Sequence, residues 1–159
     1  MSGHRVDAAA TPVEQTRIGF RVHARLPWLV LPPGMPAQQA IDPQLAPVPN
    51  VVPWLRGVLN LRGNLVPVFD LGLWQGMDAQ PADAAVLVLA PGAESVAVQC
   101  CQAPELILVG ALGASAEDDP MSTWSSGRYT SERGLVYEFH PQTWLRRVGR
   151  NVPRRSNSS

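Results

Sequence analysis

The side chains that could act as nucleophiles or soft metal ligands are few in this 159-residue chain, and they are scattered along it. The only cysteines are the neighbours Cys100 and Cys101, and the only histidines are His4, His23 and His140. Their spacing does not resemble a zinc site, and neighbouring cysteines rarely form an unstrained disulfide. A nucleophilic pair between one of the cysteines and His140 stays open at this point, although small buried cysteines without chemistry are common.

The sequence also lacks the motifs that build common active sites. There is no nucleophile elbow, no phosphate-binding loop and no dinucleotide-binding fingerprint. The acidic residues 117–119 could bind a cation, but a solvated loop explains them more simply. We therefore predict a non-enzymatic protein with no catalytic residue, no metal site and no cofactor.

The composition indicates one globular domain that is rich in turns. Apolar residues make up 45% of the chain and charged residues 16%, which is unlike a disordered protein. The 16 prolines and 13 glycines favour many short strands. The net charge is zero, and all 13 basic residues are arginine. Residues 1–16 hold no apolar run typical of a signal peptide, and no stretch reaches the ~20 apolar residues of a membrane span. We expect a cytoplasmic protein without direct membrane insertion.

Patterning along the chain predicts a mainly β domain at 16–150, between a flexible arm at 1–15 and a disordered basic, Ser-rich tail at 151–159. Alternation predicts a half-buried strand at 17–23, with Ile18, Phe20 and Val22 on its apolar face. Pro141 lies near the start of a predicted helix at 140–149, where a missing N–H costs little. Trp144, Leu145 and Val148 share one face of that helix. The other expected elements are short strands at 28–31, 105–109 and 134–139, hairpins at 55–69 and 84–101, a connector at 35–53 with at most one short helix at 37–41, and a surface loop at 113–132.

The hairpin at 55–69 is the most informative segment. Gly63 and Asn64 both tolerate positive φ and predict its turn. Pro67 has no N–H to donate, so it should lie in a non-hydrogen-bonded pair. A four-residue loop at 62–65 places it in such a pair and is therefore favoured. This loop also leaves Arg62 free to project. Either turn gives the same two faces. One face is wholly apolar, and the other is mixed: Leu59, Leu61, Val66 and Val68 form the first, and Val58, Asn60, Arg62, Leu65, Pro67 and Phe69 form the second.

The mixed face has two explanations. It is either a half-exposed strand face that another loop partly covers, or a protein-binding face, since apolar area ringed by a few polar groups marks such surfaces. Arginine is also enriched among the residues that dominate binding energy. Two glycines here, Gly57 and Gly63, are more often needed for backbone geometry than for contact. Asp70, just after the hairpin, is more consistent with a turn or cap residue than with a partner contact.

The same segment closely resembles the signature of the CheW-like domain family. The matching residues are Arg-Gly-Val-Leu-Asn-Leu-Arg-Gly at 56–63 and Leu-Val-Pro-Val-Phe-Asp-Leu at 65–71, and every signature position is met. A looser resemblance extends from Thr16 to Arg150. The chain departs from the family at Cys101 and Gln102, which replace an acidic–basic pair, and at 26–32, where an alanine-and-proline motif is distorted. It resembles a divergent member, such as one controlling twitching through type IV pili.

The resemblance implies a fold of two intertwined five-stranded SH3-like β-barrels with a short C-terminal helix. It implies a stand-alone adaptor that binds the regulatory domain of a CheA-type histidine kinase and the cytoplasmic tip of a methyl-accepting chemoreceptor. Such adaptors lie in receptor arrays at the inner face of the membrane and serve chemotaxis or twitching motility. The partner-binding residues carried over from the signature are Arg56, Gly57, Val58, Asn60, Leu61, Arg62, Gly63 and Leu65.

The alternative is a small β-barrel that binds nucleic acid through an arginine-rich C-terminus. Five arginines gather there: Arg146, Arg147, Arg150, Arg154 and Arg155. Zero net charge and the scarcity of aromatic residues on the predicted strands argue against this alternative, so no nucleic-acid partner is expected.

Overall fold

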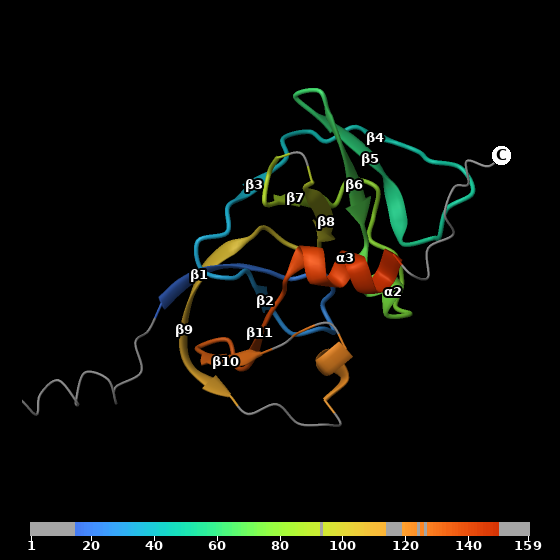
Figure 1. Cartoon of the computed structure of the whole chain (residues 1–159). Coiled ribbons are helices and arrows are strands. Elements are labelled where there is room, and N and C mark those ends of the chain that lie inside the picture. Colours follow the sequence, from blue (N-terminus) through green and yellow to red (C-terminus); the bar gives the residue numbers. More distant parts are fainter. Residues whose placement is uncertain (1–14, 93, 114–118, 124, 126, 150–159) are drawn as a thin grey trace, which may run out of the picture.

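The computed structural model of the protein describes residues 15–92, 94–113, 119–123, 125 and 127–149. It contains two β units, and one helix lies across their junction (Figure 1). The first unit is a closed five-stranded barrel with the order β1-β2-β11-β10-β9. The second is a six-stranded sheet with the order β3-β7-β8-β6-β5-β4. The expected mainly β fold, with one five-stranded barrel and a short C-terminal helix, is confirmed, but the second unit is a six-stranded sheet and not the second five-stranded barrel that was expected.

The barrel is built from both ends of the described chain. Its strands are β1 (Gln15–Phe20), β2 (Leu29–Val30), β9 (Glu105–Gly113), β10 (Arg128–Ser131) and β11 (Val136–Glu138). β1 pairs with β2 and β9, and β11 closes the barrel by running parallel to β2. Because the second unit is inserted between β2 and β9, the two units are intertwined. Buried side chains fill the barrel: Trp28, Val30, Ile107, Val109 and Val136.

The second sheet carries the hairpin singled out above. Its strands are β3 (Ala37–Gln39), β4 (Leu45–Ala46), β5 (Leu55–Leu61), β6 (Asn64–Phe69), β7 (Ala85–Leu89) and β8 (Val96–Cys100). β5 and β6 form one antiparallel hairpin, β7 and β8 form the other, and β6 joins them by pairing parallel to β8. One face of this sheet buries a small aliphatic cluster: Leu59, Val66, Val68, Val86, Val88 and Ala97.

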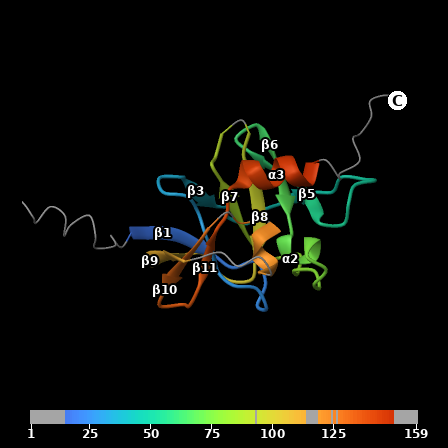
Figure 2. The same ribbon diagram turned by 60° about the horizontal axis from the view of Figure 1, so that its bottom comes forward.

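The largest core lies between the two units and is covered by α3 (Pro141–Gly149). Trp144 is its centre: its ring lies 5.0 Å from the ring of Phe69 on β6 and 5.4 Å from that of Trp74 on α2 (Leu71–Trp74). Val148 is buried beside it, and Leu145 is partly buried, so the predicted helix and its apolar face are confirmed. Both views show α3 across the junction, with β1, β9 and β10 to one side and β5 and β6 to the other (Figures 1 and 2).

Two of the predicted connecting segments contain more structure than expected. The segment 37–41 contains strand β3 rather than a short helix, because the backbone of Ala37–Gln39 pairs with β7 at the edge of the sheet. In the predicted loop 113–132, Pro120–Thr123 forms a 3₁₀ turn and Arg128–Ser131 forms β10. Burial of Met121 in the central core accounts for the first of these, because it gives the turn an apolar anchor.

The ends of the chain are described only in part. Gln15, assigned to the predicted arm, is instead the first residue of β1 and pairs with Val109. The rest of that arm and the predicted tail at 151–159 lie outside the described residues. No helix among the described residues is long and apolar enough to cross a membrane.

Candidate protein-docking site

The β5–β6 hairpin ends in a two-residue turn at Arg62 and Gly63. Both residues have positive φ, 54° and 89°, as a type I′ turn requires. Leu61 pairs with Asn64 across the turn, and the Gly63 N–H donates to the Asn60 side-chain oxygen at 2.9 Å. The predicted turn at Gly63-Asn64 and the four-residue loop at 62–65 are therefore both wrong. The bond from Asn60 fixes the chain on the near side of the turn, which helps Arg62 hold a conformation that normally favours glycine or asparagine.

Pro67 fits this turn as well as it fits a longer loop. It pairs with Val58, three pairs beyond Leu61–Asn64. Hydrogen-bonded and non-hydrogen-bonded pairs alternate along an antiparallel ladder, and the pair flanking a two-residue turn is hydrogen-bonded. The Val58–Pro67 pair is thus non-hydrogen-bonded, so the missing N–H of Pro67 leaves no gap in the ladder.

The two faces of the hairpin have the predicted character. Leu59, Val66 and Val68 are buried, and Leu61 packs against them while half-buried. The mixed face changes along its length. Near the turn, Asn60 and Leu65 lie opposite each other, and Leu65 is 68% exposed. Further down, Val58 and Pro67 are half-buried, and Phe69 belongs to the central core.

The base of the hairpin is separate from its turn. Gly57 is buried with φ of 150°, and a Cβ there would lie 2.7 Å from the backbone oxygen of Ala46. A register shift between Leu55 and Gly57 marks a β-bulge that includes the half-buried Arg56. At about 3.3 Å per residue, Arg56 lies roughly 20 Å from Arg62.

The eight predicted partner-binding residues therefore do not form one patch. One group surrounds the turn, and we call it the hairpin tip: Asn60, Leu61, Arg62, Gly63 and Leu65. The other group lies at the base and is half-buried or buried: Arg56, Gly57 and Val58.

A groove of about 310 Å³ runs beside the hairpin tip. One wall is formed by Leu59, Asn60 and Leu61, and the other by residues 38–44, the end of β3 and its connection to β4. Ile41 on that second wall is 89% exposed, the highest value for a large hydrophobic residue in the described part of the chain. Sequence reasoning missed this wall. The available signal was an isolated isoleucine beside Asp42 and Pro43, in a segment without periodicity.

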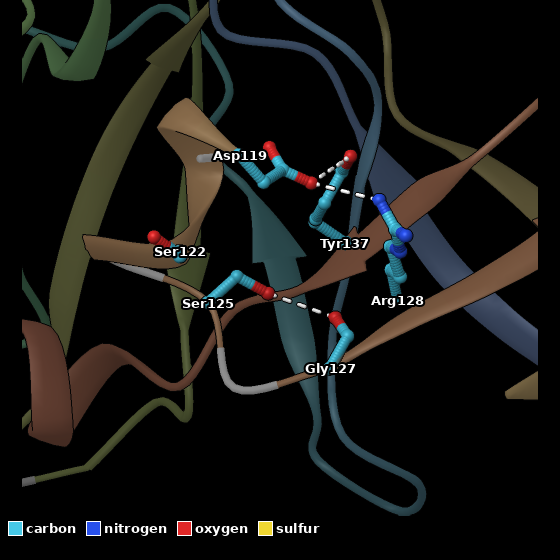
Figure 3. A pocket seen from close by; sticks show the side chains of 6 residues that line it. All are labelled: Asp119, Ser122, Ser125, Gly127, Arg128 and Tyr137. Atoms are coloured by element: carbon cyan, nitrogen blue, oxygen red, sulfur yellow. Dashed lines mark hydrogen bonds and ion pairs between the residues drawn. The ribbon is translucent and has the colours of Figure 1, made fainter. Parts of the chain in front are cut away.

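A second cavity lies beside the 3₁₀ turn and β10 (Figure 3). Its volume is about 10 Å³, room for one water molecule at most. The Asp119 carboxylate accepts hydrogen bonds from the Arg128 guanidinium at 2.9 Å and from the Tyr137 hydroxyl at 2.7 Å. The backbone N–H of Met121 and the Tyr137 hydroxyl hold the pKa of Asp119 below its ordinary value. These contacts fasten the turn to the barrel. The rest of the acidic run, residues 117 and 118, lies outside the described residues.

Neither cysteine has the lowered pKa of a reactive thiol. Burial raises the pKa of the Cys100 thiol to about 12, and burial also raises the pKa of the Cys101 thiol. Reactive cysteines need a lowered pKa, because the thiolate is the nucleophile. His140 bonds to the Glu138 carboxylate at 2.6 Å. Within the described part of the chain, no group of three or more His, Cys, Asp or Glu residues could hold a metal ion.

The arginine-rich C-terminus is described in part. Arg146 and Arg147 are exposed on α3. The other three arginines of the nucleic-acid alternative, Arg150, Arg154 and Arg155, lie outside the described residues.

Comparison with known proteins finds sequence similarity over about half of the chain and a similar fold over most of it. Residues 37–114 match the family model of the CheW-like domain. Protein PilI of Pseudomonas aeruginosa is 34% identical over 80 residues, a match that covers 46% of this chain and 44% of that protein, so the matched region spans less than half of this relative. The crystal structure of the scaffolding protein TtCheW from Thermoanaerobacter tengcongensis has a TM-score of 0.62 and 14% identity, and the match covers 80% of this chain and 90% of that one.

Proposed function

We propose that this CheW-like protein is a non-enzymatic adaptor that couples a chemoreceptor to a CheA-type histidine kinase. Its adaptor domain would run from residue 16, extended by Gln15 at the start of β1, to residue 150. It would work in a receptor array at the inner face of the membrane, in chemotaxis or in twitching motility. The family match and the PilI likeness support a coupling role in bacterial signalling.

The observation that carries the proposal is the exposure of the hairpin tip. The residues that match the family signature could have been buried, as Val68 and Phe69 are, but Asn60, Arg62 and Leu65 are exposed around a tight turn. A partner that covers the exposed Leu65 would remove its apolar area from water, and the amide and guanidinium beside it could hydrogen-bond to that partner. A two-residue turn is also rigid, so little conformational entropy is lost when a partner binds.

The groove beside the tip suits a helical partner. It offers apolar side chains, Ile41 and Leu61, together with the polar Asn60. An amphipathic helix recognises such a groove through apolar side chains one turn apart. We therefore propose that the chemoreceptor's helical cytoplasmic tip binds at the hairpin tip and groove. The kinase regulatory domain would bind another face, and many weak contacts in an array would act together.

The test is a pull-down of the kinase and of receptor tips from the same cell with wild-type protein and with Arg62→Ala. Wild type should capture both partners. Arg62→Ala should bind the receptor more weakly by over ~1 kcal/mol, about fivefold, as expected for an interface arginine. The matched control is Arg25→Ala, which removes an exposed arginine from the barrel unit. If folded wild-type protein captures neither partner, the adaptor proposal is wrong. If Arg62→Ala binds as wild type does, only the placement of the receptor is wrong.

A further inference from the structure

A charged surface cavity of about 470 Å³, which is wide open to solvent, lies at one end of the barrel, away from the hairpin tip. Four residues line it: Arg21, Trp28, Glu132 and Arg133. They come from the connection between β1 and β2 and from the turn between β10 and β11. β10 lies at the opposite end of the molecule from the β5–β6 turn (Figures 1 and 2). None of the four residues belongs to the proposed receptor site.

The guanidinium of Arg21 is held in place by the chain beneath it. Its Nε donates to the backbone oxygen of Leu26 at 3.0 Å, and one terminal nitrogen donates to that of Ala24 at 2.8 Å. A guanidinium has five N–H donors, so three remain, and they have no hydrogen-bond partner among the described residues. Arg21 is therefore fixed in position while most of its donors are unused.

Arg133 is also held, by different contacts. Its guanidinium stacks over the Trp28 ring, 4.6 Å from the ring centroid, and one terminal nitrogen pairs with the Glu105 carboxylate. Trp28 is itself buried in the barrel core, so the ring on which the guanidinium stacks is held rigidly. Two positioned guanidinium groups at one cavity form a pre-organised site for a planar anion, because little side-chain entropy is lost on binding.

The surrounding charges indicate what kind of anion fits. Arg21 and Arg133 are positive, whereas Glu132 in the lining and Glu105, the ion-pair partner of Arg133, are negative. Because these four charges cancel, the cost of desolvating the anion is decisive, and it is greater for a phosphate dianion than for a single carboxylate. A carboxylate also matches the planar fork of arginine in a bidentate pair. A volume near 470 Å³ is large enough for a side chain together with some of its backbone.

We propose that this cavity docks a carboxylate side chain of an acidic segment in a partner protein. The site is independent of the proposed receptor site, so either could fail without the other. With one docking site at each end, the molecule could hold two partners at once.

The experiment measures binding of a short fluorescein-labelled polyglutamate peptide by anisotropy, with a polyglutamine peptide of the same length as the uncharged control. Wild type should bind only polyglutamate. Arg21→Gln and Arg133→Gln should each weaken binding about tenfold, because each removes a charge-assisted pair. Glu132→Gln should strengthen binding, since it removes a repelling carboxylate. The matched control Arg25→Gln removes an exposed arginine that does not line the cavity, and it should change binding less than about twofold.

Three results would overturn the proposal. The first is no binding of polyglutamate to wild-type protein. The second is equal weakening by Arg25→Gln and Arg133→Gln, which would mean non-specific attraction. The third is tighter binding of inorganic phosphate than of the peptide, which would make the cavity a phosphate site. If Arg21→Gln unfolds because it loses the bonds to Ala24 and Leu26, Arg133→Gln and Glu132→Gln still decide the matter.

Discussion

The guanidinium of Arg17 donates to the carboxylate of Glu138 at 3.0 Å, and the two side chains are only 4% and 12% exposed. Arg17 lies on the first strand of the barrel and Glu138 ends the last. The same guanidinium nitrogen donates to the backbone oxygen of Leu31, and Glu138 accepts further bonds from the Tyr129 hydroxyl and from His140. One buried ion pair therefore ties β1 to β11 just before α3 begins.

The first prediction is that Arg17→Met lowers the free energy of unfolding by about 3–5 kcal/mol. Removing one partner of a buried pair leaves the other charge buried without compensation, and that residual charge is the main cost. Urea unfolding at pH 7 measures the effect. Exposed Arg25→Met should change stability by no more than about 0.5 kcal/mol.

A double variant separates the pair from the packing around it. Arg17→Met with Glu138→Leu should be more stable than Arg17→Met alone, since neither charge then stays behind. If the double variant loses as much free energy of unfolding as the two single variants lose together, the two side chains do not couple the strands.

The second prediction concerns acid. Burial raises the pKa of Glu138, but hydrogen bonds from Arg17, Tyr129 and His140 outweigh burial, and the net pKa lies below its ordinary value. The pKa of Asp119 is lowered too, chiefly by the Met121 N–H and the Tyr137 hydroxyl. A carboxyl whose folded pKa is depressed stabilises the fold above its unfolded pKa, and this stability is lost as pH falls through the folded pKa. Stability should therefore fall below roughly pH 4, where unfolded carboxyls protonate.

Asp119→Asn tests the assignment to one carboxyl. The variant should be less stable than wild type at neutral pH, yet lose less stability on acidification, which urea unfolding over a pH series would show. Asp83→Asn, at an exposed aspartate, is the matched control. An acid-induced loss as large in Asp119→Asn as in wild type would show that Asp119 does not contribute.

The third prediction is that Gly57→Ala destabilises the second sheet by about 1–3 kcal/mol, the range for a residue forced into an unfavourable conformation. The positive φ and the approach to the Ala46 oxygen both exclude a side chain at Gly57. Gly127→Ala is the control, because a Cβ there would make only an ordinary contact, 3.4 Å from Leu112. Thermal unfolding compares the two variants. Equal melting temperatures would mean that the bulge relaxes without cost.

Sequence reasoning predicted what depends on alternation and missed what depends on distant partners. The buried face of the hairpin was predictable. The turn lies one residue earlier in the chain than predicted, which shifts the pairing of the two strands by two residues and leaves every side chain on the same face. The turn itself was not, since Arg62 at positive φ is an uncommon choice. Arg17 alternates with apolar residues and therefore suggested an exposed face, because Glu138, 121 residues further along, is invisible to a local pattern.

The candidate site divides in the same way. The hairpin side was found because its residues carry both a strand pattern and a family signature. The wall at 38–44 was not found, because β3 and β4 have only three and two residues, too short to show any period. Long-range pairing with β7 and β5 makes these segments strands, and local propensity does not reveal it.

The fourth prediction separates folding from binding within the hairpin. Val68 is fully buried, so Val68→Asp should unfold the domain or cost over ~4 kcal/mol, because it buries a charge in the apolar face.

Arg62→Asn should act in the opposite direction. Asn-Gly is the favoured type I′ turn, so this variant should be more stable than wild type by about 0.5–1 kcal/mol, while it still removes the guanidinium from the hairpin tip. Circular dichroism with urea unfolding reports stability, and a titration with receptor tips reports binding. A variant that gains stability and loses receptor affinity would show that Arg62 contacts the receptor although it destabilises the turn. A variant that loses stability would mean instead that the arginine supports the fold, and the receptor would then have to be placed elsewhere on the molecule.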